Sequence, residues 1–181
     1  EAVENAIQVL ESLGATTKVI DVPEMEPITT AWSCVIMAEA YAYHENNIRA
    51  RGNEYGYIAP RIHTGAFYSA ADYIQSQRIR RLTQRQYNKV MEQVDVIVTP
   101  TWQGPATRFD EIVPGAPLTK GFTWVFNFNG MPALSICCGF SSNGLPLGLQ
   151  IAGRLFDETT VFRVAHAYEK ATPWHERRPP V

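Results

Sequence analysis

The sequence contains little cysteine and almost no net charge, and both features narrow its function. Its 181 residues include three cysteines and no Cys-x-x-Cys motif, which argues against a disulfide framework and indicates a reducing, cytoplasmic context. A net charge of −2 gives no support for binding to nucleic acid or to an anionic membrane. No apolar run reaches the roughly 18 residues that a transmembrane helix requires. We therefore expect one globular domain, or part of one, in the cytoplasm.

The amino terminus lacks two features of a complete gene product. The sequence opens with Glu-Ala-Val-Glu-Asn, which has neither an initiator methionine nor the pattern of a signal peptide. We therefore expect the chain to be a fragment or a processed piece of a longer protein.

Motifs for metal binding and for nucleophilic catalysis are also missing. His44-Glu45 does not continue to a second histidine, because position 48 is Ile, so a solvated helix residue is the better interpretation. The other histidines are scattered, and we expect neither a metal nor a cofactor. There is no Gly-x-Ser-x-Gly elbow, and the pair Ser141-Ser142 lies in a predicted turn. The chain is therefore predicted to hold no catalytic residue.

What the sequence does contain is a set of helical and strand patterns typical of an α/β protein. Apolar residues at helical spacing predict helices over residues 1–13, 29–51, 66–93 and 158–171. Gly14 stands where a C-cap glycine belongs, and Asp157 is placed to cap the last helix. Strands are predicted over 17–22 and 94–98, and a loop rich in Pro and Gly over 100–121.

The clearest local signal is a hairpin near the carboxyl terminus. Apolar residues alternate with period two on both sides of Asn143-Gly144, which predicts that residues 132–138 and 146–151 pair as antiparallel strands. We expect the apolar side chains Leu134, Ile136, Leu147 and Leu149 to be mostly buried.

Several segments, taken in order, resemble one known family, the amidase signature family of serine hydrolases. The similar segments are Ala38-Glu39-Ala40, Asp72-Tyr73 through Arg80, Asp95 through Thr101, Phe126-Asn127, the hairpin, and Gly153 through Glu158. The resemblance implies an α/β fold with a mixed β-sheet covered by α-helices, of which residues 1–181 are the carboxyl-terminal portion of an amidase domain.

The resemblance also implies an activity for the parent protein. Such a parent hydrolyses a carboxamide to a carboxylate and ammonia through a serine acyl-enzyme. Its two serines, its lysine and a segment like Gly-Gly-Ser-Ser-Gly-Gly lie upstream of the region matched, so this chain alone is expected to be inactive and to supply scaffold and one wall of the substrate pocket. Two alternatives stay open: a non-catalytic remnant or interaction module, and a piece of the larger chain of a glutamine-dependent tRNA amidotransferase. The partner expected is a small amide substrate, and association with a second copy is left open.

The same resemblance yields four candidate substrate-binding residues, Arg80, Thr101, Asn127 and Gln150. Arg80 matches an arginine that lines the family's pocket, and the alternative for it is a surface salt bridge; the neighbouring Arg78, Arg81 and Arg85 are best interpreted as a solvated helix face.

For two of these residues a structural role is the stronger alternative. Asn127 could tie down a loop backbone, and Gln150 could be a buried scaffold residue. Lys120 stands where the tRNA amidotransferases carry an acidic residue, and this reversed charge favours a general amidase.

Overall fold

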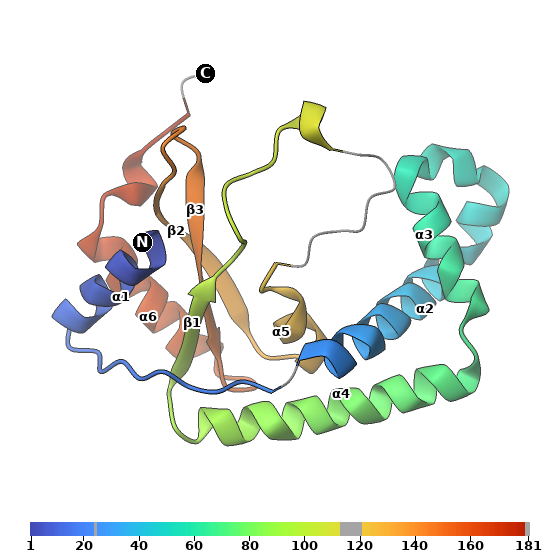
Figure 1. Ribbon diagram of the computed structural model, residues 1–181, viewed down its shortest axis with the longest axis horizontal. Coiled ribbons are helices and arrows are strands. Elements are labelled where there is room, and N and C mark those ends of the chain that lie inside the picture. The colour runs from blue at the N-terminus through green and yellow to red at the C-terminus, as the bar shows by residue number, and fades with distance from the viewer. Residues whose placement is uncertain (24, 113–120, 180–181) are drawn as a thin grey trace. The chain divides into compact units, whose positions relative to one another are not determined.

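The computed structural model describes residues 1–23, 25–112 and 121–179, which group into two compact units. The first comprises residues 1–22, 87–111 and 119–181, and the second residues 23–86 and 112–118. Figure 1 shows the elements of both. Within the described residues, no helix combines the length and apolar character needed to cross a membrane.

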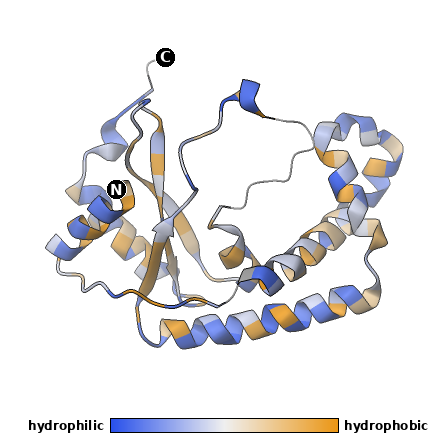
Figure 2. Cartoon of the chain, in the orientation of Figure 1, coloured by the Kyte–Doolittle hydropathy of each residue, from blue (hydrophilic) through white to orange (hydrophobic). Residues whose placement is uncertain are grey.

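The first unit is built on a three-stranded antiparallel sheet. Its strands are β1 (Val96–Pro100), β2 (Ala133–Phe140) and β3 (Pro146–Gly153), in the order β1-β3-β2. β3 is therefore the central strand, and its apolar residues colour it mostly orange in Figure 2. A β-bulge between Cys137 and Gly139 interrupts the pairing of β2 with β3.

Helices α1 (Ala2–Ser12) and α6 (Glu158–Ala171) cover one face of this sheet (Figure 1). They bury a core against β2 and β3, with Leu149 and Ile151 fully inaccessible at its centre. The predicted caps are present: Gly14 adopts φ +97 after α1, and the Asp157 carboxylate accepts a hydrogen bond from the backbone N–H of Thr160 at 3.2 Å.

The predicted hairpin is confirmed, with a different turn. The Ser141 N–H donates to the Leu145 carbonyl at 2.8 Å, so three residues form the loop. Gly144 adopts φ +77, whereas Asn143 keeps a negative φ, so this is not the two-residue turn with both residues left-handed. Leu149 is buried as predicted, while Leu134, Ile136 and Leu147 are only partly buried.

The strand predicted over residues 17–22 is wrong. This segment lies outside the sheet, Val19 is 95% exposed, and the Lys18 ammonium instead donates to the side chain of Gln93 at 2.9 Å. A run of Val and Ile forms a strand only where a neighbouring strand can pair with it.

The second unit is helical. It contains α2 (Met25–Arg51), α3 (Ala59–His63) and the first part of α4 (Ala70–Met91), with short 3₁₀ turns over 52–58 and 64–67. Gly65 allows its turn to lie against α2, because a Cβ there would come within 2.7 Å of the Met37 carbonyl carbon. Ser69 and Asp72 form a reciprocal cap at the start of α4, where the Asp72 N–H donates to the Ser69 hydroxyl at 3.1 Å.

The fold prediction is therefore confirmed as helices combined with a small antiparallel sheet. The three long predicted helices occur as α1, α2 and α4, with ends shifted by a few residues. The segment predicted as a loop from Gly52 is instead largely 3₁₀ and α-helical up to Phe67.

Candidate functional site

Polar side chains gather on the sheet face opposite α1 and α6, where Gln150 is the most buried of them. Gln150 is 3% exposed and lies in the central strand, paired with Thr99 on one side and Ser135 on the other. Its side-chain NH₂ donates to the Thr99 hydroxyl at 2.9 Å and to the Phe122 carbonyl at 3.1 Å. Because a carbonyl can only accept, the second bond fixes which way the amide points. These two bonds support the interpretation of Gln150 as a scaffold residue.

Thr101 lies directly after β1 and is held by three hydrogen bonds. Its N–H donates to the Gly148 carbonyl at 2.9 Å, and its own carbonyl accepts from the N–H of Phe122 at 3.3 Å. Its hydroxyl oxygen lies 2.6 Å from that of Ser135. Since Phe122 also accepts from Gln150, the structure brings Thr101 and Gln150 together through one backbone unit.

Ser135 is the site residue that the sequence reasoning missed. It stands between Leu134 and Ile136 in an apolar strand, on the opposite face from both. A lone hydroxyl at a period-two position of such a strand was the available signal. What the sequence could not supply is its partner, because Thr101 is 34 positions away along the chain.

Asn127 does not join this cluster. It lies on the short helix α5 (Trp124–Asn129), where Trp124, Phe126 and Phe128 are buried but Asn127 is exposed. Its backbone N–H bonds the Thr123 carbonyl at 3.4 Å. The exposed side chain does not distinguish ligand contact from the local structural role.

Arg80 belongs to the second unit and differs from its basic neighbours. It is half-buried on α4, whereas Arg78, Arg81 and Arg85 are exposed, as expected of a solvated face. The positive charge of Arg80 acts on Tyr73, the residue seven positions earlier on the same helix.

The Tyr73 hydroxyl links α4 to α2. It donates to the Glu39 carboxylate at 2.8 Å and accepts from the side-chain amide of Gln77 at 2.9 Å. The bond to Glu39 raises the pKa of Tyr73, while the nearby charge of Arg80 acts to lower it. The chain therefore surrounds Arg80 with an ordered set of polar groups.

The other candidate motifs have structural partners. His44 Nδ1 lies 3.0 Å from the Tyr55 hydroxyl, and Glu45 forms an ion pair with Arg49 at 2.8 Å. The Ser141 hydroxyl accepts from the Leu145 N–H at 3.1 Å, as a turn residue would. Among residues 1–23, 25–112 and 121–179, no three His, Cys, Asp or Glu side chains group to hold a metal. Lys120 lies outside the described residues.

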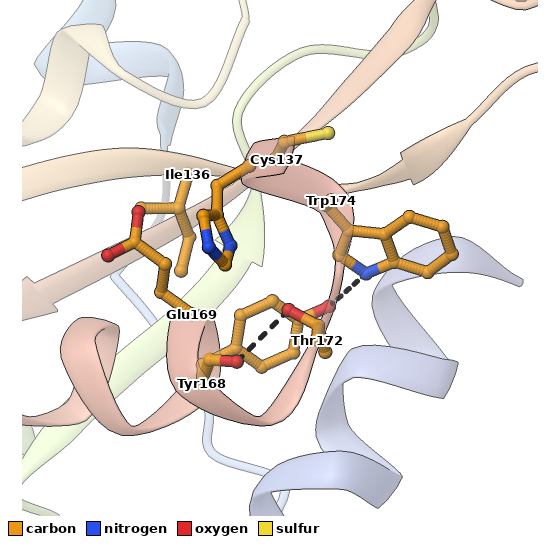
Figure 3. A pocket seen from close by; sticks show the side chains of 7 residues that line it. Ile136, Cys137, Tyr168, Glu169, Thr172 and Trp174 are labelled. Atoms are coloured by element: carbon orange, nitrogen blue, oxygen red, sulfur yellow. Dashed lines mark hydrogen bonds between the residues drawn. The ribbon is translucent and has the colours of Figure 1, made fainter. Parts of the chain in front are cut away.

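A small hollow of about 200 Å³ lies on the helix-covered side of the sheet. It is bordered by Cys137, Tyr168 and Trp174, among others, and Figure 3 shows the Cys137 sulfur pointing away from it. The Trp174 indole N–H donates to the Tyr168 hydroxyl at 3.2 Å, and the Thr172 hydroxyl donates to the Tyr168 carbonyl at 3.0 Å. These bonds fasten the chain after α6, so the hollow is a packing feature.

Comparison with known proteins is consistent across sequence and structure. A Pseudomonas putida amidase is 36% identical over 188 aligned positions, which cover 98% of this chain and 40% of that protein. The larger glutamyl-tRNA(Gln) amidotransferase chain (GatA) of Thermodesulfovibrio yellowstonii is 34% identical over 209 positions, covering 99% and 43%. The chain thus spans less than half the length of the relatives it matches.

The fold comparison points the same way. The structure of a 6-aminohexanoate cyclic dimer hydrolase matches 99% of this chain and 42% of its own, with a TM-score of 0.82 at 22% identity. The GatA structure from Thermotoga maritima matches 95% of this chain and 38% of its own, with a TM-score of 0.65 at 34% identity. The sequence profile of the Amidase family matches residues 1–162. This chain therefore belongs to the amidase signature family.

Proposed function

We propose that residues 1–181 form the carboxyl-terminal portion of an amidase that hydrolyses a carboxamide to a carboxylate and ammonia. The observation that carries the proposal is the extent of the match: relatives align with 98–99% of this chain, and the chain accounts for only 40–43% of them. In this proposal the chain supplies scaffold and one wall of the substrate pocket. The nucleophile comes from the remainder of the protein.

The chemistry requires that division of labour. A serine hydroxyl is a weak nucleophile until a neighbouring base accepts its proton, and the printed sequence holds no serine and lysine in such a motif. After attack, backbone N–H groups near the nucleophile would stabilise the oxyanion. The contribution of this chain is binding: the Thr101 hydroxyl and the Arg80 guanidinium are the groups we assign to substrate contact.

A general amidase is favoured over a tRNA amidotransferase by the alignments. Almost the same share of this chain is matched over 188 positions in the amidase but over 209 in GatA, so the second alignment needs more gaps. The basic charge of Lys120 agrees with this preference. A piece of GatA remains the second candidate, because its identity to this chain is similar.

The proposal is tested first by reading the coding sequence upstream of Glu1. An in-frame Gly/Ser-rich segment with a lysine before it is expected. A stop codon followed by a separate start would instead support a non-catalytic remnant.

The second test compares the full-length protein with residues 1–181 in an ammonia-release assay on aliphatic and aromatic carboxamides. We expect turnover only from the full-length protein. Turnover by the short chain that survives Ser141→Ala/Ser142→Ala would contradict the assignment of the nucleophile to the remainder. A full-length protein that hydrolyses none of these amides would contradict the proposed function.

A further inference from the structure

The Thr101 and Ser135 hydroxyls meet across the central strand of the sheet. Thr101 follows β1 and Ser135 lies in β2, so β3 runs between them, yet their oxygens are 2.6 Å apart. The contact is made on the polar face, beside Gln150, which pairs directly with Ser135. It joins two edge strands that have no backbone pairing with each other.

Gly148 makes this contact possible. It lies in β3 next to Thr101, whose N–H it binds through its carbonyl. A Cβ at position 148 would lie 2.6 Å from the Thr101 hydroxyl oxygen and 2.8 Å from that of Ser135. Both distances are shorter than any side-chain carbon tolerates, so every other residue at this position would force the hydroxyls apart.

The pair retains hydrogen-bonding capacity after its internal bond is made. Two hydroxyls carry two protons, and their mutual bond uses one of them, so one O–H donor and several lone pairs stay available. Ser135 is exposed and Thr101 is half-buried, so this capacity is accessible in the described chain. A carboxamide presents the complementary set, a carbonyl that accepts and N–H groups that donate.

We infer that Ser135 is a positioning residue for Thr101, and that the pair, brought together over Gly148, binds the carboxamide of the substrate at two points. This inference rests on the proposed function. Two bonds fix the Thr101 backbone, and Ser135 fixes the one freedom that remains, the direction of the hydroxyl. A fixed hydroxyl loses less conformational freedom when a substrate binds.

The test uses the full-length protein and steady-state kinetics on one carboxamide substrate. Ser135→Ala should raise KM roughly fivefold to tenfold while kcat changes less than about twofold, because the contact is the same in the ground and transition states. Ser135→Thr keeps the hydroxyl and should restore KM. Ser142→Ala, an exposed serine in the hairpin loop, is the matched control and should leave both constants unchanged.

Gly148→Ala gives the sharper test, because it keeps both hydroxyls and only separates them. We expect its KM to match that of Ser135→Ala, and the double variant to show no further loss, since both changes remove one contact. Thermal unfolding of each variant identifies any that fails to fold; if Gly148→Ala does, the Ser135→Ala and Ser135→Thr pair decides.

Two results would overturn the inference, and they differ. A wild-type protein that hydrolyses no carboxamide removes the proposed function and the inference together. An active wild-type protein whose KM is unaffected by Ser135→Ala removes only the inference.

Discussion

Arg154 binds the carbonyl oxygen of Met91, the last residue of α4, through two nitrogens of its guanidinium at 3.0 and 3.2 Å. The same group donates to the Val94 carbonyl at 2.8 Å and to the Asp95 carboxylate at 3.2 Å. The carbonyls at a helix end lack partners within the helix. Arg154, which directly follows β3, supplies them and so fastens the end of α4 to the central strand.

The first prediction follows from this contact. Arg154→Ala should lower the free energy of unfolding of residues 1–181 by about 1–2 kcal/mol. Hydrogen bonds from a charged group contribute roughly 1.5–3 kcal/mol, and we reduce this because 43% of the side chain is exposed. Urea denaturation measures the change.

Two further variants sharpen that experiment. Arg154→Lys should recover only part of the loss, because an ammonium cannot fork between carbonyls. Arg163→Ala, an exposed arginine on α6, is the control and should stay near wild type. Equal stability of the Arg154→Ala and Arg163→Ala variants would show that the helix end needs no such partner.

The second prediction concerns the hairpin loop. Gly144→Val should cost about 1–2 kcal/mol in the same assay, because Gly144 adopts φ +77, a conformation that L-residues with a Cβ avoid. Asn143→Ala is the neighbouring control and should cost less than about 0.5 kcal/mol, since Asn143 keeps a negative φ. A larger loss at Asn143 than at Gly144 would contradict the observed turn.

The third prediction concerns the adjacent cysteines. Cys138 is 3% exposed and belongs to the core under α1 and α6, where burial raises the pKa of its thiol. Cys137 is only partly buried, and its sulfur points away from the neighbouring hollow (Figure 3). A thiol reagent at neutral pH should therefore modify Cys137 well before Cys138.

Mass spectrometry of timed samples measures the order of modification. Cys137→Ser should remove the fast phase, and Cys138→Ser should retain it. A fast phase that disappears instead with Cys138→Ser would mean that the core around β2 is open. Cys34 is buried and should react slowly in every variant.

The fourth prediction concerns Arg80 in the full-length protein. If Arg80 contacts the substrate, Arg80→Ala should lower kcat/KM roughly tenfold or more, and Arg80→Lys should not restore it fully if the contact is bidentate. Arg81→Ala replaces an exposed arginine next to it and is the matched control. Equal kinetics for Arg80→Ala and Arg81→Ala would reduce Arg80 to a surface charge.

The sequence by itself determined the local elements. Period-two alternation located both strands of the hairpin, helical spacing located α1, α2 and α4, and Asp157 marked the start of α6. These patterns depend on residues that are close in the chain, so they can be seen without the fold. The order of matched motifs likewise sufficed to identify the family.

Only the tertiary structure decided which distant residues meet. It excluded residues 17–22 from the sheet, because no strand lies beside them among the described residues, and it placed Arg154 at the end of α4. It also joined Thr101 to Ser135 over Gly148. The physical reason is strand register: a hydroxyl finds its partner only after two separate strands align on a third, and no local pattern encodes that alignment.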